Sequence, residues 1–110
     1  MNKDLKERAF DLAMHGVEWK RKLRIQYPEI GSQVVKSLTS IGANIAESER
    51  AESKKDWIHK LQISAKEAQE ALFWLKLINE QIEPCQEQID SLNYLLGTLI
   101  NIIRRTRKKL

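Results

Sequence analysis

Cysteine, proline and glycine are scarce in this 110-residue chain, which has one, two and four of them respectively. The single cysteine, Cys85, excludes an intramolecular disulfide framework and a zinc site built from several thiolates. Few prolines and glycines mean few of the residues that mark turns. We therefore expect short loops and a chain that is held together by packing alone.

Long apolar runs are also missing. No stretch approaches the roughly 18 consecutive apolar residues of a membrane helix, and the N-terminal MNKDLKERAF lacks the apolar core of a signal peptide. Together with the lone cysteine, these absences predict a cytoplasmic protein without a membrane partner.

The sequence lacks recognisable catalytic motifs. It has neither a Gly-x-Ser-x-Gly motif nor a Gly-rich phosphate loop. His15 and His59 fall in different predicted helices, and neither has a second His or Cys three or four residues away. Cys85 begins a predicted helix whose dipole could lower its pKa, although burial beside Pro84 is the stronger interpretation. We expect no catalytic residue, no metal and no cofactor.

Strong helix formers and core aliphatics dominate the chain instead. Apolar residues recur at alternating spacings of three and four, which is the pattern of an amphipathic helix. They predict helices over residues 4–26, 32–50, 54–82 and 85–106. The first loop is expected from Tyr27 to Ser32, because the residue before Pro28 resists the α conformation. Short loops between four helices predict an all-α, antiparallel up-down-up-down bundle in one domain, residues 1–110.

Three of these helices carry apolar residues outside their main stripe. These additional residues are Phe10, Ala13, Val17, Phe73, Trp74, Leu77, Ile78, Leu95, Ile100 and Ile102. A monomeric bundle needs one stripe per helix, so a second stripe suggests surface that is buried against another copy. A wide stripe in a small core is the alternative. We favour a homo-oligomer.

Positive charge is concentrated in two clusters, although the net charge is only +4. The first, the Lys20 cluster, is Lys20, Arg21, Lys22 and Arg24. The second, the Arg104 cluster, is Arg104, Arg105, Arg107, Lys108 and Lys109. The two clusters together contribute nine positive charges, so the rest of the chain has a net charge of −5.

Clustered Lys and Arg residues bind nucleic acid phosphates without sequence preference. Cations are also favoured at helix C-termini, but the helix dipole accounts for only one or two in each cluster. The antiparallel topology puts the two clusters at opposite ends, about 30 Å apart for helices of about 20 residues.

Trp19, next to the first cluster, could stack nucleobases. Most carboxylates, such as Glu70 beside Lys66, read as members of a solvated face.

Residues 40–78, SIGANIAESERAESKKDWIHKLQISAKEAQEALFWLKLI, resemble the signature of the bacterial ribosomal RNA intervening-sequence proteins, a family of four-helix bundles. The matching positions are Ser40, Ile41, Asn44, Ile45 and Glu47, then Ser53, Lys54, Asp56 and Trp57, then Ala65, Lys66, Glu67, Ala68, Phe73, Trp74 and Leu75. The motif itself covers about a third of the 110 residues. The four-helix layout of the family covers nearly all of them.

The resemblance implies a small cytoplasmic bundle that assembles into a ring, typically a pentamer, without enzyme activity. Some members are encoded inside insertions of ribosomal RNA genes. A related branch, the accessory variability protein of diversity-generating retroelements, is a basic pentameric barrel associated with a reverse transcriptase and RNA. A reverse transcriptase partner is expected only in that branch, and the Asn-Ile-Ala-Glu block at residues 44–47 is that of the intervening-sequence branch.

The signature residues Ser40, Asn44 and Glu47 continue a polar seam that begins at Ser37. We interpret Asn44 and Glu47 as hydrogen-bonding groups that fix helix packing or subunit register, with Gly42 letting a neighbouring helix come close. Ser53 is a plausible N-cap, with Asp56 reaching back in a capping box.

The sequence therefore predicts a non-catalytic, homo-oligomeric interaction module that binds nucleic acid, with RNA favoured, through phosphate contacts from both clusters. The alternative is a protein-binding or structural adaptor with no nucleic-acid ligand, in which the basic residues serve helix capping and solubility.

Overall fold

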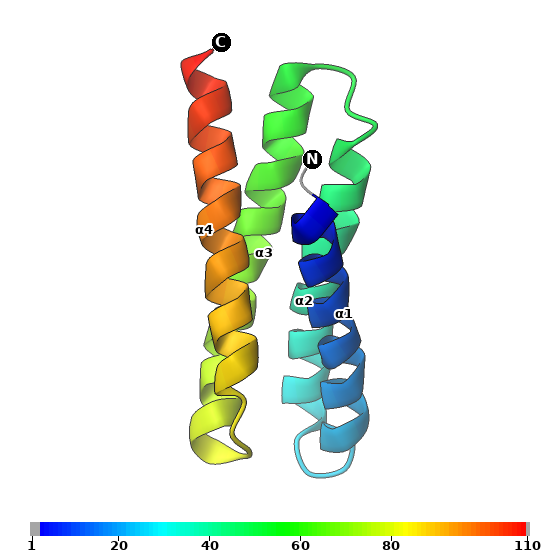
Figure 1. Cartoon of the computed structure of the whole chain (residues 1–110). Helices are drawn as coiled ribbons and strands as arrows, with labels where there is room; N and C mark the ends of the chain where they lie inside the picture. Colours follow the sequence, from blue (N-terminus) through cyan, green and yellow to red (C-terminus); the bar gives the residue numbers. More distant parts are fainter. Residues whose placement is uncertain (1–2, 110) are drawn as a thin grey trace.

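The structure, a computed structural model, describes residues 3–109. It consists of four helices: α1 (Lys3–Leu23), α2 (Pro28–Ser48), α3 (Lys54–Gln81) and α4 (Gln86–Lys108). Figure 1 shows that the helices run antiparallel, so the starts of α1 and α3 lie at the same end as the finish of α2 and α4. We call this the Arg104 end, and the opposite end the Lys20 end. The part of the chain that is described contains no strand, and the predicted all-α four-helix bundle is confirmed.

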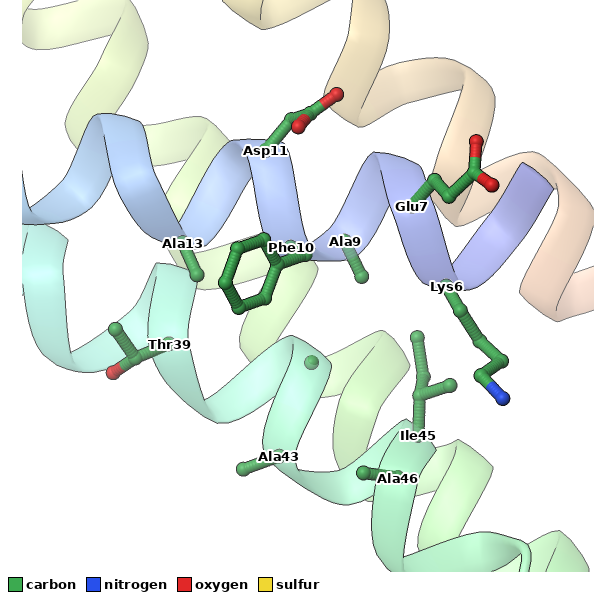
Figure 2. A pocket seen from close by; sticks show the side chains of 11 residues that line it. Lys6, Glu7, Ala9, Phe10, Asp11, Ala13, Thr39, Ala43, Ile45 and Ala46 are labelled. Atoms are coloured by element: carbon green, nitrogen blue, oxygen red, sulfur yellow. The ribbon is translucent and has the colours of Figure 1, made fainter. Parts of the chain in front are cut away.

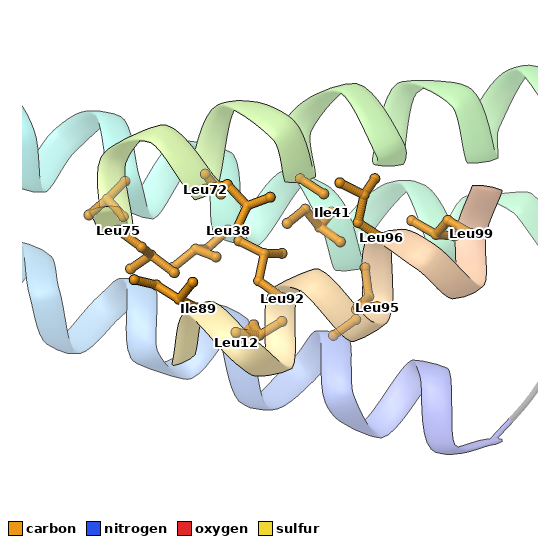
Figure 3. Close-up of a cluster of buried hydrophobic side chains, with 14 of the residues drawn as sticks. Leu12, Leu38, Ile41, Leu72, Leu75, Ile89, Leu92, Leu95, Leu96 and Leu99 are labelled. Atoms are coloured by element: carbon orange, nitrogen blue, oxygen red, sulfur yellow. The ribbon is translucent and has the colours of Figure 1, made fainter. Parts of the chain in front are cut away.

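The core lies along the bundle axis and receives side chains from every helix (Figure 3). Leu12 of α1, Leu38 and Ile41 of α2, Leu75 of α3 and Leu92 of α4 are essentially inaccessible to solvent. Burial of a Leu or Ile side chain stabilises the folded state by about 1.5–3 kcal/mol. The predicted apolar stripes are thus the contact faces of the helices.

The closest approach between α1 and α2 depends on Gly16. A Cβ atom at Gly16 would lie 3.1 Å from the Leu38 Cβ and 3.3 Å from the Val35 Cα, which is tighter than ordinary contact. At Gly42, the nearest atom to such a Cβ would be the Ala9 Cβ at 3.7 Å, an ordinary van der Waals distance. A Cβ at Gly31 would likewise lie 3.3 Å from the Lys20 Cα, so Gly16 and Gly31, and not Gly42, allow the close approach of α1 and α2. Packing between α1 and α4 is much less extensive than between α1 and α2.

The predicted first loop is wrong in its position. Helix α1 ends at Leu23 and α2 begins at Pro28, so residues 24–27 form the loop. Proline is well suited to the first helical position, because the N–H that it lacks would have no acceptor there. The conformational restriction on the residue before a proline therefore falls on Tyr27, which is the last residue of the loop. Gly31, which was expected in the loop, is a buried residue of α2. The other helix limits differ from the expected ones by at most two residues.

The second apolar stripe divides into two groups. Ile78 and Leu95 are completely buried, as a wide core requires. Phe10, Val17 and Phe73 are 65%, 47% and 59% exposed, so this part of the stripe faces outward in one protomer. Among residues 3–109, no helix is long and apolar enough to cross a membrane.

Candidate nucleic-acid interface

The Lys20 cluster occupies the last turn of α1 and the start of the following loop, and its side chains are exposed. One of its cations is already compensated, because the Lys22 Nζ lies 3.0 Å from the Glu83 Oε2. The Lys22 Nζ also lies 5.1 Å from the centre of the Trp19 ring. The cluster is thus a mixed surface in which acidic and aromatic groups accompany the positive charge.

Trp19 is not available for base stacking. Its side chain is only 3% exposed, and its Nε1 donates a hydrogen bond of 2.7 Å to the Gln88 Oε1 of α4. This bond ties α1 to α4 near the Lys20 end, where a buried indole N–H requires an acceptor. The sequence suggested a nucleobase contact here, and the tertiary structure assigns Trp19 to the core instead.

The Arg104 cluster has a different electrostatic environment. Its members occupy the last turns of α4 and the C-cap residue Lys109, and all are exposed. Asp90 is the last acidic residue of the sequence. Within residues 3–109, no carboxylate forms an ion pair with any member of this cluster. Five cations at this end thus have no ion-pair partner within the described residues.

The two clusters cannot form one patch within a protomer. They lie at opposite ends of a bundle whose longest dimension is 47 Å. The separation follows directly from the antiparallel directions of α1 and α4.

The polar signature residues make structural contacts. The Asn44 Nδ2 donates to the Ser40 carbonyl oxygen of its own helix at 2.9 Å, so this bond does not cross to a neighbour. The Glu47 Oε1 lies 3.1 Å from the Lys60 Nζ and links α2 to α3. The Ser53 Oγ accepts the Asp56 N–H at 3.0 Å, as an N-cap does.

Asp56 completes the start of α3 in a variant of the expected capping box. Its Oδ2 accepts the N–H of Glu52 at 3.2 Å, one residue before the N–H of Ser53 that a standard box uses. Of the contacts of the polar signature residues, only the Glu47–Lys60 ion pair joins α2 to α3.

A polar contact between the buried Ser37 of α2 and Glu70 of α3 is not predictable from the sequence pattern. The Oγ of the fully buried Ser37 donates to the Glu70 Oε2 at 2.7 Å, and the Trp74 Nε1 reaches the same oxygen at 3.3 Å. The hydrogen bond from Ser37, followed by that from Trp74, lowers the pKa of Glu70 below its ordinary value. The sequence pattern predicts that Glu70 pairs with Lys66 of its own helix. The contact with Ser37 could not be predicted, because spacing along one helix carries no information on contacts with a neighbouring helix.

Cys85 stands at the N-cap position of α4 but is not an activated thiol. Its side chain is buried, and its Sγ lies 3.3 Å from the Leu75 carbonyl oxygen. Burial, with a smaller contribution from Glu83, raises the pKa of Cys85. The thiol is therefore protonated at neutral pH.

His15 lies near polar groups of two helices. Its Nδ1 is 3.4 Å from both the Glu18 Oε1 and the Gln88 Nε2. Over residues 3–109, no group of three His, Cys, Asp or Glu side chains is arranged to hold a metal ion.

Comparison with known proteins agrees with this architecture. The model of the family described as 23S rRNA-intervening sequence protein matches residues 1–105. The chain belongs to this family. The resemblance seen in residues 40–78 is thereby confirmed.

Three chains among solved structures match this chain. One of them is in the 1.70 Å crystal structure of a protein with unknown function from the S23 ribosomal protein family of Bacteroides thetaiotaomicron VPI-5482. The two chains are 32% identical with a TM-score of 0.81, and the match covers 91% of this chain and 95% of that one. The comparison with curated proteins finds no match.

Proposed function

We propose that this protein is a non-catalytic, homo-oligomeric module that binds RNA through phosphate contacts. The supporting observation is the concentration of nine cations in two exposed clusters on a body with a net charge of −5. Phosphate contacts of this kind give affinity without requiring a catalytic or base-reading pocket. The family description, which refers to an intervening sequence of 23S rRNA, favours RNA over DNA.

Self-association is supported by an outward-facing apolar surface on α1. Phe10, Met14 and Val17 recur at spacings of four and three, and all three are exposed. Phe10 flanks an open groove of about 710 Å³ between α1 and α2 (Figure 2). The groove is lined mainly by small side chains, including Ala13, Ala43 and Ala46.

Soluble proteins rarely leave large apolar patches in water, so a second copy is the proposed cover for this surface. A ring, with a pentamer favoured by the family resemblance, would repeat each basic cluster around a rim. The rim would present many more cations to RNA than one protomer does.

Salt dependence tests RNA binding. The wild-type protein is titrated with a labelled single-stranded RNA, and with DNA of the same sequence, over a series of salt concentrations. The logarithm of affinity should fall linearly with the logarithm of salt concentration, with a slope of about −0.7 for each phosphate contacted. Replacing all nine cluster residues by Gln should flatten the slope. Absence of binding even at low salt would refute the proposed ligand.

The alternative function, a protein-binding or structural adaptor, is favoured by the same exposed apolar surface on α1. It predicts assembly without salt-dependent RNA affinity. Measuring mass and RNA binding on one preparation therefore separates the two functions.

A further inference from the structure

A groove of about 520 Å³ lies between α3 and α4 at the Arg104 end. It is lined by Gln62, Ala65, Ile100, Ile103, Arg104, Arg107 and Lys108. The α4 residues follow the spacing of one helix face, so three of the five members of the Arg104 cluster point to this groove. Among the residues that the structure describes, no carboxylate lines it.

The α3 side of the groove adds further cations. Lys55, His59, Gln62 and Lys66 are spaced by four, three and four residues, which places them along one face of α3. Of these four residues only Gln62 lines the groove, so the face lies beside it. Lys55 and Lys66 do not line the groove, but both are exposed on this face of α3. Lys66 also interacts electrostatically with Glu70, one turn further along the helix.

Three carboxylates at the Arg104 end make contacts away from the groove. Glu47 pairs with Lys60 at 3.1 Å and Glu49 with Lys6 at 3.0 Å, so both lie at contacts of α2. Asp56 is occupied by the start of α3, where it accepts a backbone N–H. The positive charge beside the groove is therefore not neutralised by these acidic residues.

The Lys20 end differs because a carboxylate there forms an ion pair with a member of the basic cluster itself. Glu80 and Glu83 end α3 and enter the loop there, and Glu29 and Glu87 lie in the first turns of α2 and α4. Glu83 pairs with Lys22. A phosphate chain approaching this end would meet carboxylates as well as cations.

We propose that the α3–α4 groove at the Arg104 end is the surface of each protomer that holds the sugar-phosphate backbone of RNA, and that the Lys20 cluster contributes little. This inference rests on the proposed function. Arg104, Arg107 and Lys108 contact phosphates from the α4 bank. The apolar floor of Ile100 and Ile103 receives the ribose carbons, and the amide of Gln62 is able to hydrogen-bond a 2′-hydroxyl.

Two triple variants of equal charge test this assignment. R104Q/R107Q/K108Q removes three cations from the groove, and K20Q/R21Q/R24Q removes three from the opposite end. The probe is a labelled single-stranded RNA oligonucleotide of mixed sequence. The groove variant should lose on the order of tenfold or more in affinity at low salt, and its salt slope should fall by about 2 for three lost phosphate contacts. The control variant should remain close to wild type.

A gentler pair of substitutions tests the groove without removing any basic residue. Gln62→Glu introduces one negative charge among the lining residues, and Gln33→Glu introduces the same charge on an exposed position of α2 outside this groove. Only Gln62→Glu should weaken RNA binding severalfold. Urea unfolding of each variant establishes that the loss does not come from misfolding.

The possible outcomes distinguish this inference from the proposed function. RNA binding by the wild type with equal losses in both triple variants would overturn the groove assignment and leave RNA binding standing. Failure of the wild type to bind RNA would overturn both. A change of oligomeric mass in R104Q/R107Q/K108Q, measured by light scattering, would identify the groove as a subunit contact and would also overturn the assignment.

Discussion

Gly16 controls, through a single missing side chain, how closely α1 approaches α2. A Cβ atom added at Gly16 would lie only 3.1 Å from the Leu38 Cβ. A methyl group therefore fits there only if α2 moves. A Cβ atom added at Gly97, in the middle of α4, would have no heavy atom of the described residues within 4 Å apart from the nearby backbone of its own helix. Two glycines in helix interiors thus have opposite structural roles.

The same substitution at these two glycines should have opposite effects. Gly97→Ala should raise the free energy of unfolding by about 0.5–1 kcal/mol, because alanine favours the helix and restricts the unfolded chain. Gly16→Ala gains the same propensity, but overpacking costs about 1–3 kcal/mol, so a net loss of stability is expected. Urea unfolding measures both, and equal stabilisation would contradict the tight α1–α2 contact.

The Ser37–Glu70 contact should make stability depend on pH. The pKa of Glu70 is lowered in the folded state by the hydrogen bond from Ser37, so its carboxylate stabilises the fold above its ordinary pKa of 4.5. That contribution is lost as the pH falls through the lower folded pKa. Since Glu70 is well exposed, we expect Glu70→Gln to cost only about 0.5 kcal/mol at pH 7.

Urea unfolding of wild type and Glu70→Gln at several pH values checks this prediction. The difference between them should shrink as the pH falls below 4.5, the ordinary pKa of Glu70. A double-mutant cycle with Ser37→Ala provides the control, because the two substitutions should be non-additive if the hydrogen bond carries the effect. A difference that is independent of pH, or full additivity, would contradict it.

Among the elements, α3 is the longest, with 28 residues from Lys54 to Gln81, and it packs on both α2 and α4. Its start is defined by the Ser53 side chain, which accepts the Asp56 N–H. Because α3 packs against two neighbours, a weakened start affects both the α2–α3 junction and the bank of the groove.

Ser53→Ala should lower the free energy of unfolding by about 1 kcal/mol, because an N-terminal N–H of α3 loses its acceptor. Ser32→Ala is the matched control, since Ser32 is an exposed residue within α2 and alanine is the better helix former there. The control should be neutral or slightly stabilising in urea unfolding. Equal effects of the two substitutions would show that the cap contributes nothing to stability.

The whole molecule carries an exposed apolar surface on one side and uncompensated positive charge at one end. Phe10 and Val17 remain accessible after the core has formed. A single copy of the bundle has no further helix with which to cover them. We propose that a second copy of the chain covers these side chains.

We expect the wild-type protein to be oligomeric at micromolar concentration, and Phe10→Ser/Val17→Ser to shift the mass toward the monomer. Since both side chains are largely exposed in the protomer, the helical content should stay unchanged. Ile25→Ser is the control, because Ile25 is 81% exposed but lies in the loop before α2. Light scattering measures the mass, and a clean wild-type monomer would refute the assembly.

Much of the protomer was predictable because it depends on local spacing. A repeat of apolar residues every three or four positions places one face of a helix toward the core in any packed arrangement. The stripe of Leu5, Leu12 and Leu23 is buried as this rule requires. The N-cap at Ser53 was equally predictable, because a cap is a contact between residues three positions apart.

The sequence by itself therefore determined four helices, their antiparallel order, their buried faces and the ends at which positive charge collects. The tertiary structure alone decided that Trp19 is bonded to Gln88, that Ser37 reaches Glu70 and that Gln62 lies across a groove from Arg107. The physical reason is that spacing describes one helix at a time, whereas each of these contacts depends on how two helices are rotated and translated against each other. That arrangement is set by the packing of the whole core.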